Sequence, residues 1–148
     1  MKQHEYKKIF AALDGTPAQQ EVAARAVQAA SANKAELVFG HIVVDTPDRL
    51  TGENKANYIE GVKESFEETL GALLDEARAD ERIPSVEVRV AAGSVEEALH
   101  HKLIDEFEPD LVICGERGLS GVQYVFVGSV STYLIRHLRC DVLVVKQD

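Results

Sequence analysis

Cysteine, basic residues and long apolar runs are all scarce in this chain of 148 residues. Two cysteines are too few for a disulfide scaffold, and Cys114 and Cys140 lie within or beside apolar segments, so we expect both to be buried thiols. Lys and Arg total 16 against 25 Asp and Glu, which gives a formal net charge of -9. This negative charge disfavours a general affinity for nucleic acid or for an anionic membrane.

No segment approaches the roughly 20 apolar residues that are needed to span a bilayer. The first eight residues lack the apolar core and the cleavage site of a signal peptide. The chain also lacks the P-loop, the G-x-G-x-x-G fingerprint and the G-x-S-x-G elbow, and no general base can be identified. With 45% hydrophobic and 28% charged residues, the sequence predicts a single cytoplasmic domain over residues 1–148.

Segments typical of strands alternate with segments typical of helices along the chain. We predict strands at 8–13, 36–44, 86–90, 110–115 and 142–145. We predict helices at 16–31, 59–77, 94–106 and from Ser129 onward, with Thr16 and Ser94 as N-terminal caps. The alternation predicts an α/β fold with a doubly wound, five-stranded parallel sheet and helices on both faces. The fold class implies the strand order 3-2-1-4-5.

A glycine-rich segment follows the fourth predicted strand. It reads Gly115-Glu-Arg-Gly118, then nine residues, then Gly128-Ser129. Glycines let backbone amides approach an anion, and a helix that starts at Ser129 presents unpaired N–H groups, so the segment is suited to phosphate. In the predicted strand order, Asp14 at the end of the first strand faces this loop. A carboxylate there can accept hydrogen bonds from ribose, and the two features together indicate a nucleotide.

Each part of this predicted site also has a purely structural interpretation. Residues 14–16 are typical of a turn with an Asx-type hydrogen bond. Ser129 could serve only as a helix cap, and Arg117 could be an ordinary solvated arginine. Val43 and Val44 are most simply core residues, although the end of the second strand could also wall an adenine pocket.

A second group of residues has the composition of a metal site. Glu97, His100 and His101 lie on one predicted helix, but the chain has no Cys/His spacing of a structural zinc site. A solvated helix face is the simpler interpretation of these three side chains.

The chain resembles the universal stress protein family over essentially its full length. Residues 8–16 resemble the family's first strand with its aspartate, and the G-x2-G-x9-G-S pattern matches the family's ATP-binding pattern. Residues 130–131 and 140–145 resemble the closing helix and strand. The sequence departs from the family at Thr16, where Ser is common, and at Asp141, where Pro is usual.

The resemblance implies a bound nucleotide and its contacts. Asp14 and Val43 would contact ribose and adenine, and the phosphates would lie among the glycines of the pattern and Ser129. The full set of implied binding residues is Asp14, Gly15, Thr16, Val43, Gly115, Arg117, Gly118, Gly128, Ser129, Val130 and Ser131. The implied ligand is ATP, with AMP or ADP possible, together with Mg2+ or Mn2+.

The last predicted strand indicates a homodimer. It would lie at a sheet edge, and an unpaired apolar edge strand is an aggregation hazard. Pairing with the same strand of a second copy would cover it through a two-fold contact, and family members pair their last strands in this way. The residues concerned are Val142, Leu143, Val144 and Val145.

Two functions follow as hypotheses. The first is an ATP-binding universal stress protein that acts in stress response, with the nucleotide as a ligand or a slowly hydrolysed substrate. No catalytic residue is predicted, so we expect at most slow ATP hydrolysis or phosphotransfer, and slow hydrolysis would depend on a positioned water. The second is a dimeric protein-interaction module of the same fold that holds no nucleotide. A true phosphotransferase or ATPase is a third possibility, which would need a general base.

Overall fold

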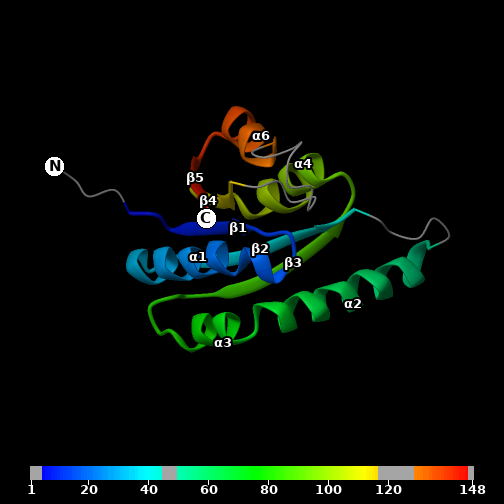
Figure 1. Ribbon diagram of the computed structural model, residues 1–148, viewed down its shortest axis with the longest axis horizontal. Coiled ribbons are helices and arrows are strands. Elements are labelled where there is room, and N and C mark those ends of the chain that lie inside the picture. The colour runs from blue at the N-terminus through cyan, green and yellow to red at the C-terminus, as the bar shows by residue number, and fades with distance from the viewer. Residues whose placement is uncertain (1–4, 45–49, 117–128, 147–148) are drawn as a thin grey trace.

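The computed structural model describes residues 5–44, 50–116 and 129–146. Five strands form one sheet in the order β3-β2-β1-β4-β5, and every neighbouring pair is parallel (Figure 1). The strands are β1 (Lys8–Ala12), β2 (Glu36–Val43), β3 (Val86–Ala92), β4 (Leu111–Gly115) and β5 (Asp141–Val145). The predicted fold class and strand order are confirmed.

Helices cover both faces of the sheet (Figure 1). One face packs against α1 (Gln20–Asn33), α2 (Gly52–Leu70) and α3 (Ala72–Ala79). The other packs against α6 (Ser129–His137) and a continuous helix that comprises α4 (Val95–Ala98), the π-helical segment η2 (Leu99–Ile104) and α5 (Asp105–Phe107). Successive β1 residues alternate between the two cores, with Ile9 and Ala11 in one and Phe10 and Ala12 in the other, because strand side chains point to alternate faces.

Three helix predictions were wrong in their details. The helix predicted over 59–77 begins earlier, at Gly52, and is broken between α2 and α3 at Gly71, whose φ of 51° lies in the left-handed region. A short 3-10 helix, η1 (Pro17–Gln19), precedes α1, and neither Thr16 nor Ser94 makes a side-chain capping hydrogen bond. The Thr16 hydroxyl instead donates to Asp14.

Both cysteines are free thiols, but they differ in burial. Cys114 is fully buried in β4, and burial raises the pKa of its thiol to about 12. Cys140 is only partly buried, so the prediction of two buried thiols holds for Cys114 alone. Among the described residues, no helix has both the length and the apolar character of a membrane span.

Candidate functional site

The ends of β1 and β4 lie side by side at the carboxyl edge of the sheet. Ala11 pairs with Ile113, so the chain leaves β1 toward Asp14 next to the point where β4 ends at Gly115. The Glu116 amide donates to the Val145 carbonyl at 2.9 Å, which holds the start of the glycine-rich segment against β5. The structure thus places the two predicted halves of the site on adjacent strands, at the position where the strand order reverses.

Asp14 forms the Asx-type turn that was one of its two interpretations. Its Oδ1 atom accepts hydrogen bonds from the Thr16 amide at 2.8 Å and from the Thr16 hydroxyl at 2.7 Å. Gly15, between them, has a φ of 81°, and a Cβ at this position would lie 3.0 Å from the His41 ring. The turn therefore holds the carboxylate in one orientation, and the His41 ring lies beside Gly15.

His41 was not identified from the sequence as part of the site. It extends from β2, its Nδ1 lies 3.2 Å from the Leu13 carbonyl oxygen, and its ring centroid lies 5.1 Å from that of Phe66. Burial lowers the pKa of His41, while the hydrogen bond with Leu13 and the charge of Asp14 oppose this shift. The available signal was one polar side chain within the apolar run of residues 37–44.

Gln19 was likewise not identified from the sequence as part of the site, yet its side chain packs directly on the glycine-rich segment. The side chain is 4% exposed, and a Cβ at Gly115 would lie 3.3 Å from its Nε2 atom. Its Oε1 atom is buried and has no hydrogen-bond partner among the described residues. A buried oxygen without a partner costs about 1–3 kcal/mol, so a polar group placed beside Gln19 Oε1 would be stabilising.

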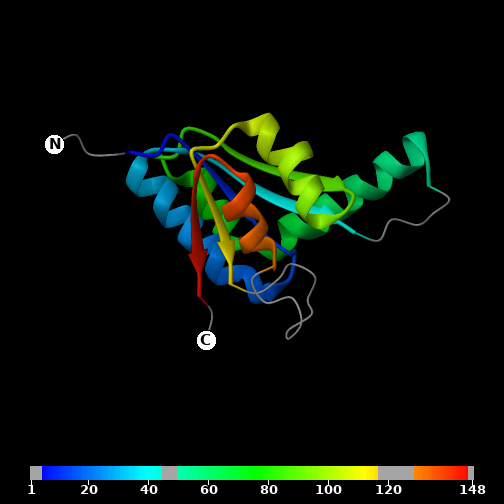
Figure 2. The same ribbon diagram turned by 90° about the horizontal axis from the view of Figure 1, so that it is seen from above.

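Of the other predicted site residues, four belong to the part of the chain that the structure describes and three do not. Val43 is 8% exposed at the end of β2, where its carbonyl accepts a hydrogen bond from the Gly93 amide, and Ser129, Val130 and Ser131 form the first turn of α6. Since β4 and β5 are parallel, α6 runs back from the carboxyl edge, so Ser129 lies at the edge where β4 ends (Figure 2). Arg117, Gly118 and Gly128 lie outside the described residues.

The chain matches a known protein family over nearly its whole length. Residues 5–146 match the model of the universal stress protein family. A protein of Staphylococcus haemolyticus, named as a universal stress protein, is 34% identical over 143 residues, which cover 97% of this chain and 86% of the relative.

Solved structures of the same family share the fold. The universal stress protein UspA from Lactobacillus plantarum superposes with a TM-score of 0.76 at 19% identity and covers 97% of this chain and 99% of its own. A universal stress protein crystallised in complex with cAMP has a TM-score of 0.64 at 26% identity, with 96% of this chain and 98% of its own covered.

Proposed function

The chain belongs to the universal stress protein family, and from this premise we propose that it binds an adenine nucleotide, foremost ATP, as a protein of the stress response. The observation that carries the proposal is the placement of Asp14 and Gly115 at the ends of adjacent parallel strands. Open α/β sheets bind ligands at this position, beyond the carboxyl ends of the strands. The related protein crystallised with cAMP supports an adenine nucleotide as the ligand class.

The proposed contacts divide between the two strand ends. On the β1 side, Asp14 uses Oδ1 to hold its turn, so its second carboxylate oxygen is the one suited to a ribose hydroxyl. Gly15 and Thr16 complete this side, and Val43 provides an apolar wall for adenine. On the β4 side, the phosphates would lie among residues of the glycine-rich segment and α6, namely Gly115, Arg117, Gly118, Gly128, Ser129, Val130 and Ser131.

The start of α6 supplies a physical reason for phosphate at this edge. The nine residues of α6 present unpaired amides and the positive end of the helix dipole at Ser129. A Mg2+ or Mn2+ ion would accompany ATP as the usual counterion of its phosphates. We assign no catalytic residue, so hydrolysis would be slow at most.

We further propose a homodimer that forms through β5. A single domain over residues 1–148 and a cytoplasmic location also stay predictions. The second candidate function, a dimeric interaction module without nucleotide, rests on the exposed Leu143 of β5.

Two measurements on the full chain separate these functions. The first is mass spectrometry of any nucleotide released when freshly purified protein is denatured. The second is calorimetric titration with ATP and Mg2+ of the wild type, Gly128→Val and Gly61→Val. Gly61 lies on the exposed side of α2, and a Cβ there would contact nothing within 4 Å, so its variant controls for the glycine-to-valine change itself.

We expect released ATP, or micromolar binding that Gly128→Val loses and Gly61→Val retains. A chain that releases no nucleotide and gives no heat with ATP, ADP or AMP would contradict nucleotide binding and leave the interaction module as the function. Equal loss in both variants would show that the effect is not specific to the phosphate segment.

A further inference from the structure

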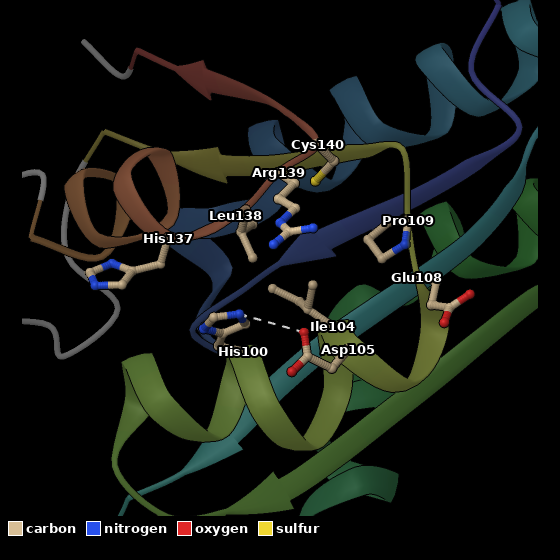
Figure 3. A pocket seen from close by; sticks show the side chains of 9 residues that line it. All are labelled: His100, Ile104, Asp105, Glu108, Pro109, His137, Leu138, Arg139 and Cys140. Carbon is tan, nitrogen blue, oxygen red and sulfur yellow. Dashed lines mark ion pairs between the residues drawn. The ribbon is translucent and has the colours of Figure 1, made fainter.

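Two histidines and an aspartate lie close together on the continuous helix of α4, η2 and α5, away from the proposed nucleotide site at the carboxyl ends of the strands. His100 Nε2 lies 3.5 Å from Asp105 Oδ1, and His101 Nδ1 lies 3.1 Å from Asp105 Oδ2 (the first pair is drawn in Figure 3). One ligand atom from each residue can be chosen so that all three lie within 4.8 Å of one another. We propose that His100, His101 and Asp105 form a binding site for one Zn2+ ion.

The π-helical segment explains why these three side chains share one face. In a regular α-helix, residues five apart point about 140° away from each other around the axis. Here the Asp105 amide donates to the His100 carbonyl, five residues earlier, which brings these two residues onto one side of the helix. His101 is four residues before Asp105 and joins them there. The sequence suggested Glu97 as the carboxylate partner of the two histidines, whereas the structure groups them with Asp105.

The spacing of the ligand atoms suits a tetrahedral ion. Zinc binds imidazole nitrogen and carboxylate oxygen at about 2.1 Å, so neighbouring ligand atoms in a tetrahedron lie about 3.4 Å apart. The two nitrogen–oxygen separations, 3.5 and 3.1 Å, are close to this value, but each joins a different oxygen of Asp105. With one ligand atom from each residue the separations are at most 4.8 Å, so the atoms would have to move closer by up to about 1.4 Å on binding. Two imidazoles and one carboxylate form a set of three ligands that leaves a fourth position for water, and imidazole favours zinc over magnesium.

Tyr133 of α6 provides the outer hydrogen bond that oriented metal ligands usually have. Its hydroxyl oxygen lies 3.0 Å from His100 Nδ1, so His100 is held with Nε2 toward Asp105. With Nε2 bound to the ion, Nδ1 would carry the proton and donate to Tyr133. The His100 side chain is 15% exposed and those of His101 and Asp105 are 60% and 54% exposed, so an ion can enter from solvent.

Negative charge surrounds the proposed site. Glu96 and Glu97, in the first turn of α4, lie close enough to Tyr133 to interact with it electrostatically, as Asp105 does. These carboxylates would offset the charge of a divalent cation. One cationic side chain, Arg139, extends into the adjoining hollow of about 420 Å³ from the segment after α6 (Figure 3).

The hollow lies at the opposite end of the sheet from the proposed nucleotide site. It is lined by Pro109, two residues before β4, and by Cys140, immediately before β5, whereas Asp14 follows β1 and Gly115 ends β4. The zinc proposal therefore does not depend on nucleotide binding, and either can fail alone.

The test is calorimetric titration of the tag-free full chain with Zn2+ alone, followed by visible spectroscopy with Co2+ in place of zinc. We expect one ion per chain and the d–d absorption of tetrahedral Co2+. His101→Ala and Asp105→Asn should each weaken binding by about tenfold or more, and Tyr133→Phe by about tenfold because it removes the outer hydrogen bond. Mg2+ alone should give no saturable heat.

Two control variants separate this site from other metal-binding groups in the same hollow. His137→Ala should retain zinc affinity within about threefold, because the His137 ring centroid is 6.5 Å from that of His100 and its Nδ1 contacts the Tyr133 carbonyl. Cys140→Ser should likewise retain binding. The proposal is overturned if no saturable binding of one ion is found, if Asp105→Asn binds as tightly as the wild type, or if the controls lose as much affinity as His101→Ala. Thermal unfolding of each apo variant will show that it is folded.

Discussion

At the residue scale, we expect His41 to make the free energy of unfolding depend on pH. Burial lowers its pKa because the imidazolium form loses hydration, and the Leu13 hydrogen bond and the Asp14 charge only partly offset this effect. An unfolded histidine has a pKa of about 6.5, so below that pH the unfolded chain takes up a proton that the folded chain resists. The contribution of His41 to stability is thus present above about pH 6.5 and is lost as the pH falls through the folded pKa.

Urea unfolding between pH 7.5 and pH 5 measures this effect. We expect the free energy of unfolding of the wild type to decrease more steeply with falling pH than that of His41→Gln, whose amide can still donate to the Leu13 carbonyl. His137→Gln removes an exposed histidine and should keep the steep dependence. Equal slopes for the wild type and His41→Gln would contradict the assignment.

The candidate site shows how far single residues can be interpreted from sequence. Asp14 and Gly115 were placed correctly because strand ends follow from the alternation of elements, and strand order then makes them neighbours. The hydrogen bonds of Asp14 to Thr16 matched the structural alternative for that turn. Gln19 and His41 were missed because their roles depend on contacts between elements, with Gly115 and with Gly15, that no local pattern contains.

At the element scale, the packing of β1 beside β2 depends on the absence of a side chain at Gly40. Gly40 is next to Phe10, whose buried ring lies over it, and a Cβ at position 40 would be 2.1 Å from the Phe10 Cζ atom. Overpacking of a core typically costs about 1–3 kcal/mol. We therefore expect Gly40→Ala to lower the free energy of unfolding by at least this much, because the ring and the strand pairing must both shift.

Chemical denaturation of Gly40→Ala beside Gly61→Ala tests this expectation. Gly61 lies within α2 with open space around it, so alanine there should stabilise by about 0.5–1 kcal/mol through helix propensity. Opposite signs for the two variants are expected. A neutral Gly40→Ala would show that the Phe10 ring can move aside without cost.

The elements themselves were predictable where periodicity decides and not where a single backbone angle does. Apolar runs and alternation located all five strands, because burial on the sheet imposes those patterns. The helical spacing of residues 59–77 continues across Gly71, so the pattern could not reveal the break that its positive φ creates. The π-helical turn at 99–104 was invisible for the same reason, although it decides which side chains share a face with Asp105.

At the scale of the whole molecule, β3 and β5 are the two edges of the sheet. The two edge strands differ in how far other elements cover them. β3 packs against α2, whereas Leu143 of β5 is 39% exposed. Asp141, which replaces the proline usual in the resembled family, accepts a hydrogen bond from the Tyr6 hydroxyl at 2.7 Å. Its carboxylate is therefore held by its own chain, and this leaves residues 142–145 as the part of the edge that is suited to a second copy.

Light scattering at micromolar concentration tests the proposed homodimer. We expect the mass of two chains for the wild type and of one chain for Leu143→Glu, because a two-fold contact brings both copies of the introduced carboxylate to the same edge and leaves them desolvated or in repulsion. Tyr58→Glu is the matched control, since Tyr58 is 37% exposed on α2, which packs beside the opposite edge strand. It should remain dimeric. A wild type with the mass of one chain would contradict the dimer, and loss of the dimer in both variants would mean that added charge, rather than the β5 edge, governs association.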